Sequence, residues 1–224
     1  MIAPNFGRIA TLLRKVPLPM TSAPVRDPLS DHLLAPQNAA LLLIDYQPSQ
    51  LAGVRSMDQA LLVKNAVSTV KTIKTFGIPV VHSTINVASG RGQPTLPELA
   101  GLLTDDKPLD RTTTNSWEDI EFVQAVHATG RRKLILCALW TEICMAFTAL
   151  DALREGYEVY PVVDAIGGTS PEAHHAGLDR VMQAGGQPVS WVSLAVELQR
   201  DWARQDTVQA IIDIVLTDRL LKEQ

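Results

Sequence analysis

KLILCALWTEICMAFTALDALRE, residues Lys133 to Glu155, combines two periodicities in one short stretch. Residues 134–139 form a continuous run of apolar, strand-prone residues. The apolar residues that follow recur at three- and four-residue steps, which is typical of a helix. Only Trp140 and Thr141 separate the two patterns. The stretch therefore predicts a strand, a tight turn and a helix in direct succession.

The expected turn leads to a cysteine, Cys144. Thr141 is a favoured N-cap residue, which places Cys144 in the first helical turn, where free backbone N–H groups and the positive end of the helix dipole lie. This environment is predicted to lower the pKa of the thiol, and the thiolate is the form that attacks carbonyl carbons. The alternative is that Cys144 is only a small buried hydrophobic residue.

The rest of the chain also alternates between strand and helix patterns. The expected strands are 39–46 (AALLLIDY), 78–83, 134–139, 158–163 and 189–192. The expected helices are 56–76, 117–129, 141–155, 170–184, 193–202 and 206–221. Such alternation predicts right-handed crossovers and an α/β fold, a three-layer α-β-α sandwich with an open, mostly parallel sheet.

The chain is predicted to divide into three parts. Residues 1–37 are Pro-rich and have no acidic residue before Asp27, so we expect an arm outside the core, either an organellar presequence or a segment that packs on a neighbouring subunit. Residues 38–204 form the expected domain, and residues 205–224 the expected C-terminal helix. Apolar positions without an evident partner in this helix predict a homo-oligomer. They are Ile211, Ile212, Ile214, Val215, Leu220 and Leu221.

The composition and charge of the chain limit the classes of function that we expect. The 224 residues are 46% apolar with a net charge of −4, as in ordinary globular proteins. Scattered basic residues and the lack of a long apolar run predict neither nucleic-acid nor membrane binding, so a small molecule is the expected partner. Cys137 and Cys144, the two cysteines, provide no framework for secretion or for a structural metal. We therefore expect a cytoplasmic protein, or a mitochondrial one if the arm is a presequence.

Candidate functional residues follow the expected strands. In parallel sheets, ligands bind beyond the carboxyl ends of the strands. That edge is predicted to gather Asp45, the loop around Arg111, Cys144 and Asp164. A carboxylate beside a thiol can take its proton, so Asp45 is a candidate base for a nucleophilic Cys144. Asp164 is expected to stabilise the loop after its strand.

Four segments carry a family resemblance. They are LLLIDYQ (41–47), DRTTTNSWED (110–119), LWTEICMAFTALDALREGYEVYPVVDA (139–165) and ELQRDW (197–202). Over about residues 38–204 the chain resembles the isochorismatase-like cysteine hydrolases and their YcaC-like branch. The resemblance implies a Rossmann-like topology, a catalytic triad of Asp45, Arg111 and Cys144, and no cofactor. It also implies a homo-oligomer, which in this branch suggests an octamer.

The resemblance further implies a cis peptide bond between Leu139 and Trp140. The N–H groups of Trp140 and Cys144 would then form an oxyanion hole. Arg111 occupies the place of a family lysine. Since guanidinium does not give up its proton, it is expected to act by charge and hydrogen bonding.

Three residues are expected in the substrate pocket. They are Gln47, Trp117 and Trp140, and the two tryptophans could equally fill space in the core.

We expect no metal site. Nicotinamidases of the wider family bind a metal through an Asp-x-His pair in the loop that corresponds to HSTINVASGRGQ (82–93), which has no such pair. No dinucleotide or phosphate-binding glycine motif is present either. The predicted function is a cofactor-free cysteine hydrolase that cleaves a small amide or related acyl compound through a Cys144 thioester. The alternatives are a non-catalytic oligomeric binding protein and, disfavoured because Cys137 lies in an expected buried strand, a redox thiol protein.

Overall fold

The computed structural model of the protein describes residues 26–220, and within them five parallel strands form one sheet in the order β3-β2-β1-β4-β5. The strands are β1 (Ala39–Ile44), β2 (Val80–Ile85), β3 (Leu109–Arg111), β4 (Lys133–Ala138) and β5 (Glu158–Pro161). Every residue of the central strands β1 and β4 is buried. Because helices cover both faces of these strands, their sequences are apolar at every position after Lys133 in β4 and throughout β1, rather than alternating.

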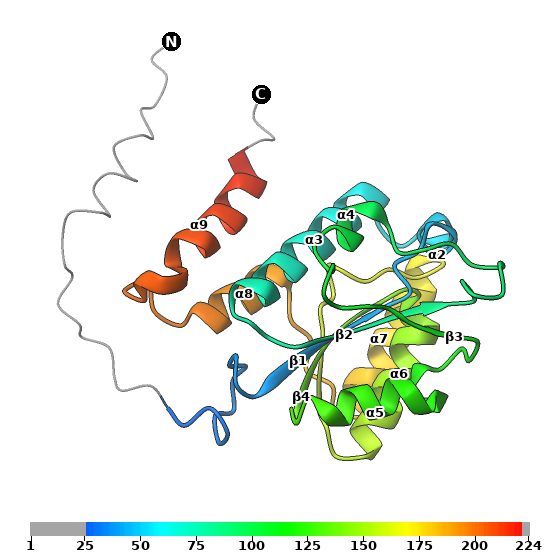
Figure 1. The fold of residues 1–224 in the computed structure, drawn as a ribbon, viewed down its shortest axis with the longest axis horizontal. Coiled ribbons are helices and arrows are strands. Elements are labelled where there is room, and N and C mark those ends of the chain that lie inside the picture. The colour runs from blue at the N-terminus through cyan, green and yellow to red at the C-terminus, as the bar shows by residue number, and fades with distance from the viewer. Residues whose placement is uncertain (1–25, 221–224) are drawn as a thin grey trace, which may run out of the picture.

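Two helical layers enclose the sheet (Figure 1). One contains α3 (Gln59–Thr75), α4 (Pro97–Ala100), α8 (Trp191–Gln199) and α9 (Gln205–Leu220), and the other α5 (Ile120–Ala128), α6 (Ala146–Arg154) and α7 (Pro171–Gln183). Three short elements complete the fold: α2 (Pro48–Gly53), a 3-10 turn η1 (Ser116–Glu118) and a π-helical turn η2 (Thr141–Met145). The predicted three-layer α/β sandwich is confirmed.

Several elements differ from the sequence prediction, which did not include the short helix α2. Strand β3 lies within the segment expected to be a loop, and pairs with β2 at the edge of the sheet. Residues 189–192 form no strand, because only Val189 makes a parallel bridge, to Val162. Ser190 and Ser193 form a reciprocal capping box that begins α8 at Trp191, two residues earlier than expected.

The described part of the expected N-terminal arm packs on the domain instead of lying outside its core. Leu34 is fully buried in the core beneath α3 and α8. Lys133 Nζ donates hydrogen bonds to the carbonyl oxygens of Asp31 (2.7 Å) and Leu33 (3.0 Å), and Arg200 donates to that of Leu34 (2.7 Å). Residues 1–25, which carry the presequence hypothesis, lie outside the described part of the chain.

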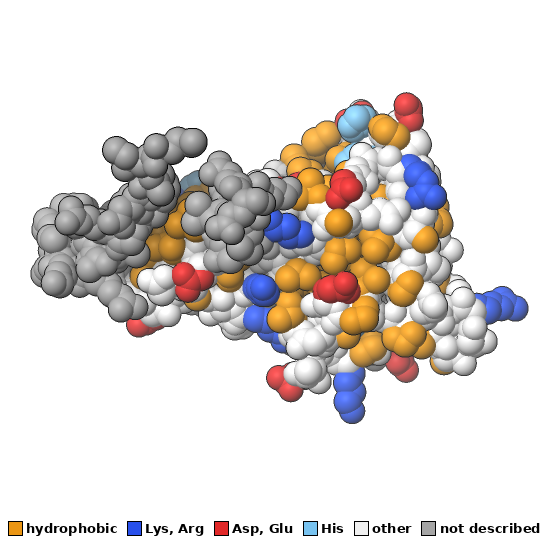
Figure 2. Space-filling view, turned by 90° about the horizontal axis from the view of Figure 1, so that it is seen from above, with side chains coloured by type: hydrophobic (Ala, Val, Ile, Leu, Met, Phe, Trp, Pro, Cys, Tyr) orange, Lys and Arg blue, Asp and Glu red, His pale blue; other side chains and the backbone are white. Residues whose placement is uncertain are grey.

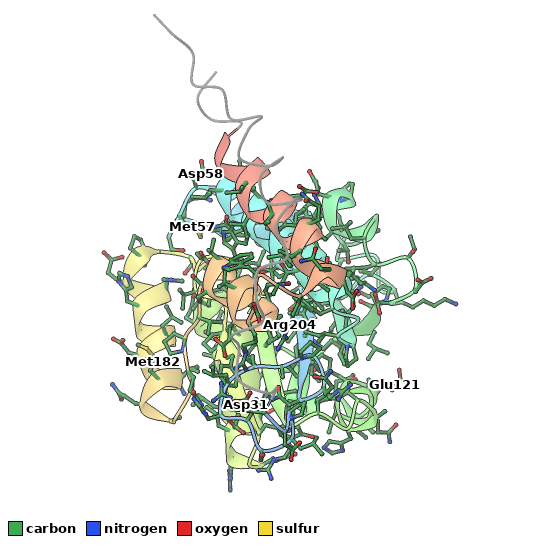
Figure 3. All side chains as sticks on the ribbon, turned by 90° about the vertical axis from the view of Figure 1, so that its left-hand side faces the viewer. Asp31, Met57, Asp58, Glu121, Met182 and Arg204 are labelled. Carbon is green, nitrogen blue, oxygen red and sulfur yellow. The ribbon has the colours of Figure 1, made fainter. Side chains whose placement is uncertain are left out.

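The C-terminal helix α9 has a partner within the chain. It lies over α3 and extends toward Asp58, which precedes that helix (Figure 3). Ile211 is fully buried, and Ile214 and Val215 pack against the same core. Part of the apolar surface that predicted an oligomer is therefore buried by α3 and α8. The side chain of Leu220 and residue Leu221 lie outside the described structure.

We expect Ile211→Ala to lower the free energy of unfolding by about 2–4 kcal/mol, because it removes a fully buried side chain from the contact between α9 and the core. Urea unfolding followed by circular dichroism measures this change. The matched control is Gln209→Ala on the same helix, where the side chain is exposed and the expected change is below about 0.5 kcal/mol. Equal effects of both substitutions would contradict the docking of α9 through Ile211.

Candidate active site

The strand order reverses between β1 and β4, and this creates the candidate site. The chain leaves β1 toward α3 in one helical layer, whereas it leaves β4 toward α6 in the other. The place beyond the carboxyl ends of two strands whose loops diverge in this way is where α/β proteins bind their ligands. Asp45 follows β1 and Cys144 follows β4, so both lie at this edge of the sheet.

Asp45 directly follows β1 and has an unusual backbone conformation. Its φ is 60°, in the left-handed region that Asp and Asn tolerate better than most residues. Its N–H donates a hydrogen bond to the carbonyl oxygen of Ser83 at the end of β2 (3.0 Å), which links the turn to the neighbouring strand. The side chain of Asp45 is fully buried. A carboxylate in this position needs a charged or polar partner.

Arg111 is that partner. Its Nη2 donates to Asp45 Oδ2 at 2.6 Å, and both side chains are almost completely buried. Nη1 of Arg111 donates to the carbonyl oxygens of Thr113 and Thr114, so the loop after β3 holds the guanidinium in place. Two buried atoms of the pair, Asp45 Oδ1 and Arg111 Nε, have no hydrogen-bond partner of normal geometry among the described residues.

Cys144 lies in the π-helical turn η2, and only 7% of its surface is exposed. The N-cap position belongs to Trp140, without a side-chain cap, and the expected Thr141 cap is wrong. Instead the Thr141 hydroxyl is hydrogen-bonded to Nδ1 of His174 on α7 (2.8 Å). The turn therefore places Cys144 at the carboxyl edge of the sheet, as predicted, through a different set of contacts.

The electrostatics of the thiol differ from the sequence prediction. Burial, followed by the neighbouring Asp45 carboxylate, raises the pKa of Cys144 to about 12, while Arg111 opposes the increase. Burial likewise raises the pKa of Asp45, which Arg111 and the neighbouring Cys144 thiol oppose. The expected lowering of the thiol pKa is wrong because a dry environment and an adjacent negative charge outweigh the helix terminus. The resting site thus contains a neutral thiol beside an ion pair.

The turn also carries a backbone donor, the N–H of Trp140, without a backbone acceptor among the described residues. The peptide bond between Leu139 and Trp140 is cis, as the family resemblance implies. The N–H groups of Leu139, Thr141, Ile143 and Met145 donate to backbone carbonyl oxygens, whereas that of Trp140 donates to none in residues 26–220. A free N–H next to a thiol is the arrangement that stabilises an oxyanion.

Two of the three expected pocket residues have structural contacts instead. Gln47 is fully buried, and its amide bonds to the backbone of Ile85 and Gln93. Trp117 donates from Nε1 to Glu155 (2.7 Å), at the end of α6 opposite to Cys144. Both roles depend on residues distant in sequence, which no local pattern indicates.

Trp140, the third, is half-buried beside Cys144. Its Nε1 donates to the carbonyl oxygen of Gln50 (2.6 Å). Its ring packs so closely on Gly53 of α2 that a Cβ there would lie 2.4 Å from a ring carbon. This packing fixes the side chain at the border of the site.

The loop after β5 borders the site through contacts that sequence reasoning missed. Asp164 accepts a hydrogen bond from the N–H of Trp191 (2.8 Å) and so holds the loop, as expected. Thr169 of this loop and His174 of α7 also contact the cysteine-bearing turn, through Glu142 and Thr141 respectively. Two glycines at their contacts, Gly168 and Gly177, are the only local sign of this packing in the sequence.

Three further observations concern the described residues. Between residues 26 and 220, no group of three or more His, Cys, Asp or Glu side chains is placed to hold a metal ion. Cys137 and Cys144 are both free thiols. No helix in this part of the chain has the length and apolar character needed to cross a membrane.

Comparison with known proteins identifies relatives of this chain. The isochorismatase domain model matches residues 39–193. The probable hydrolase YcaC of Escherichia coli is 37% identical over 166 residues, which cover 74% of this chain and 79% of YcaC. The solved structure of YcaC from Pseudomonas aeruginosa, which contains covalent acrylamide and hexane-2,5-diol, has a TM-score of 0.74 at 29% identity, covering 85% of this chain and 98% of that one. The solved structure of Escherichia coli YcaC, described as an octameric hydrolase of unknown specificity, also has a TM-score of 0.74. It is 31% identical, and the match covers 86% of this chain and 98% of that one.

We expect opposite shifts in the pKa of Cys144 when its two charged neighbours are removed. Asp45→Asn should lower this pKa because it removes the carboxylate that disfavours thiolate, and Arg111→Ala should raise it because it removes the opposing cation. The pH dependence of Cys144 alkylation by iodoacetamide, resolved from Cys137 by peptide mass spectrometry, measures both shifts. Overlapping pH profiles of the two variants and the parent would show that neither residue acts on the thiol.

Proposed function

The chain belongs to the isochorismatase family of hydrolases, and we propose that it cleaves a small amide or related acyl substrate through a thioester at Cys144. The observation that carries the proposal is the buried ion pair of Asp45 and Arg111 beside the thiol, at the reversal of the strand order. The covalent acrylamide in Pseudomonas aeruginosa YcaC supports it, because acrylamide adds to nucleophiles and resembles a small amide.

In the proposed first half-reaction, proton transfer and attack occur together. With a pKa of about 12, the Cys144 thiol is protonated at neutral pH, so it must lose its proton to Asp45 as sulfur attacks the carbonyl carbon. The N–H groups of Trp140 and Cys144 would stabilise the resulting oxyanion. The carbon–nitrogen bond then breaks, the proton passes from Asp45 to the leaving amine, and a thioester remains.

In the second half-reaction, Asp45 takes a proton from water, and the oxygen attacks the thioester. The carbon–sulfur bond breaks, the carboxylic acid leaves, and the proton returns to sulfur. Arg111 acts in both half-reactions by its charge and its hydrogen bonds rather than by proton transfer. Its proposed role is to keep Asp45 ionised in a buried site that would otherwise favour the neutral acid.

We also propose a homo-oligomer, as described for Escherichia coli YcaC. Large apolar side chains remain exposed on and beside the layer of α3, α8 and α9: Leu61, Val196, Trp202 and Leu216. Figure 2, which views the molecule from above the orientation of Figure 1, shows apolar side chains between charged ones over this face. Such surface favours association with other copies of the chain.

We expect Cys144→Ala to abolish covalent labelling by acrylamide and hydrolysis of small amides, while the melting temperature stays within a few degrees of the parent value. The matched control is Cys137→Ala, which removes the other thiol and should keep labelling at Cys144, since Cys137 is fully buried in β4. Mass spectrometry and a thermal melt measure these results. Full hydrolysis by folded Cys144→Ala would overturn the proposal, and labelling without hydrolysis in the parent would favour a non-catalytic binding protein.

We expect light scattering at micromolar concentration to give a mass several times that of the 24.4 kDa chain. Trp202→Glu, which places a charge on the exposed apolar surface, should shift the population toward smaller species. A monomer mass for the parent protein would contradict the proposed assembly.

A further inference from the structure

The turn that carries Cys144, residues 139–145, is attached by its outer side to the loop 167–170. Leu139 forms a parallel bridge with Gly167, and the N–H of Thr141 donates to the carbonyl oxygen of Gly167 (3.0 Å). These backbone contacts join the end of β4 to the segment that follows β5. The position of the turn is therefore fixed by contacts with the loop 167–170 as well as by the sheet.

Glu142 strengthens this attachment with its side chain. Its Oε1 accepts hydrogen bonds from both the N–H (3.0 Å) and the hydroxyl (2.6 Å) of Thr169. Its Oε2 is buried and has no hydrogen-bond partner among the described residues. Hydrogen bonds to an ionised carboxylate are among the stronger ones in proteins.

Two glycines make room for Glu142. A Cβ on Gly168 would lie 2.6 Å from Glu142 Oε2, and a Cβ on Gly177 of α7 would lie 2.7 Å from Glu142 Cα. Both distances are shorter than any normal carbon contact. Glu142 is thus held by close packing against α7 as well as by hydrogen bonds.

A second bond holds the same side of the turn. The hydroxyl of Thr141 is hydrogen-bonded to Nδ1 of His174 on α7 (2.8 Å). Consecutive residues, Thr141 and Glu142, are therefore fixed to α7 and its preceding loop. The free N–H of Trp140 and the thiol of Cys144 lie on either side of this fixed pair.

We propose that Glu142 is a positioning residue, which clamps residues 139–145 and so holds the Trp140 N–H and the Cys144 thiol in the alignment needed for attack on a carbonyl. Its effect on turnover rests on the proposed function; its effect on the turn does not. Glu142 is no second base for the thiol. Its Oε1 is occupied by Thr169, and the charged groups that act on Cys144 are Asp45 and Arg111.

The test compares Glu142→Ala, Glu142→Gln and Thr169→Val with the parent. The matched control is Glu172→Gln, which changes an exposed carboxylate on α7. Amide hydrogen exchange of residues 139–147 reports the clamp directly. The probe for chemistry is 4-nitrophenyl acetate, whose carbonyl accepts the Cys144 sulfur with release of 4-nitrophenolate. The pH midpoint of Cys144 alkylation by iodoacetamide reports the thiol alone.

In Glu142→Ala we expect faster exchange in residues 139–147 with unchanged exchange in β1. Acylation should slow about 10- to 100-fold at saturating probe, with little change in KM and in the alkylation midpoint. Glu142→Gln should regain most of the rate, because its amide oxygen can still accept from Thr169. The acylation rate of Thr169→Val should lie between those of Glu142→Ala and the parent. If Glu142→Ala fails to fold, Thr169→Val and Glu142→Gln are compared with the parent instead.

If folded Glu142→Ala exchanges the amide hydrogens of residues 139–147 at the parent rate, the clamp is overturned. If Glu142→Ala does not fold, the same result in Thr169→Val overturns it. Equal losses in Glu142→Ala and Glu172→Gln would also overturn it. Failure of the proposed function gives a different result: the parent itself would show no acylation that depends on Cys144, while the exchange data would still decide whether Glu142 clamps the turn.

Discussion

The buried ion pair between Asp45 and Arg111 is the interaction on which the candidate site depends. Removing two charges from water costs several kcal/mol for each ion, and replacing such pairs with apolar residues often stabilises a protein. Stability alone is therefore a poor reason for this pair. In the proposed mechanism it has a chemical reason, because a desolvated Asp45 without Arg111 would hold its proton and could not accept another from Cys144.

The pair also gives β3, a three-residue strand at the edge of the sheet, a role in the candidate site. Neighbouring residues of a strand point to opposite faces. On β3, Arg111 reaches Asp45 on one side, while the carboxylate of Asp110 accepts hydrogen bonds from the N–H groups of Val87 (2.9 Å) and Ala88 (2.8 Å) on the other. One short strand thus supplies the cation of the site and fixes the loop that follows β2. The fold brings the ends of β1, β3 and β4 together, although Asp45 and Cys144 are 99 positions apart in the sequence.

The sequence predicts best those features that depend on local pattern. Asp45 and Cys144 adjoin long apolar strands, so their place at the carboxyl edge of the sheet could be predicted from periodicity alone. Arg111 could be proposed only through the family resemblance, because β3 is short and lies in a segment rich in Gly, Pro and Thr. The side-chain contacts of Gln47 and Trp117 join residues 38 or more positions apart, and no local pattern indicates them.

The pKa of Cys144 is another property that local sequence pattern does not predict. The sequence places the thiol near a helix N-terminus, which favours thiolate, but burial and the Asp45 carboxylate depend on the tertiary structure and act in the opposite direction. The central claim is therefore that the resting thiol is protonated and that Asp45 removes its proton during attack. Ultraviolet difference absorbance between the parent and Cys144→Ser, followed against pH, detects thiolate directly. The account predicts no thiolate signal from Cys144 at neutral pH, and a full thiolate signal there would contradict it.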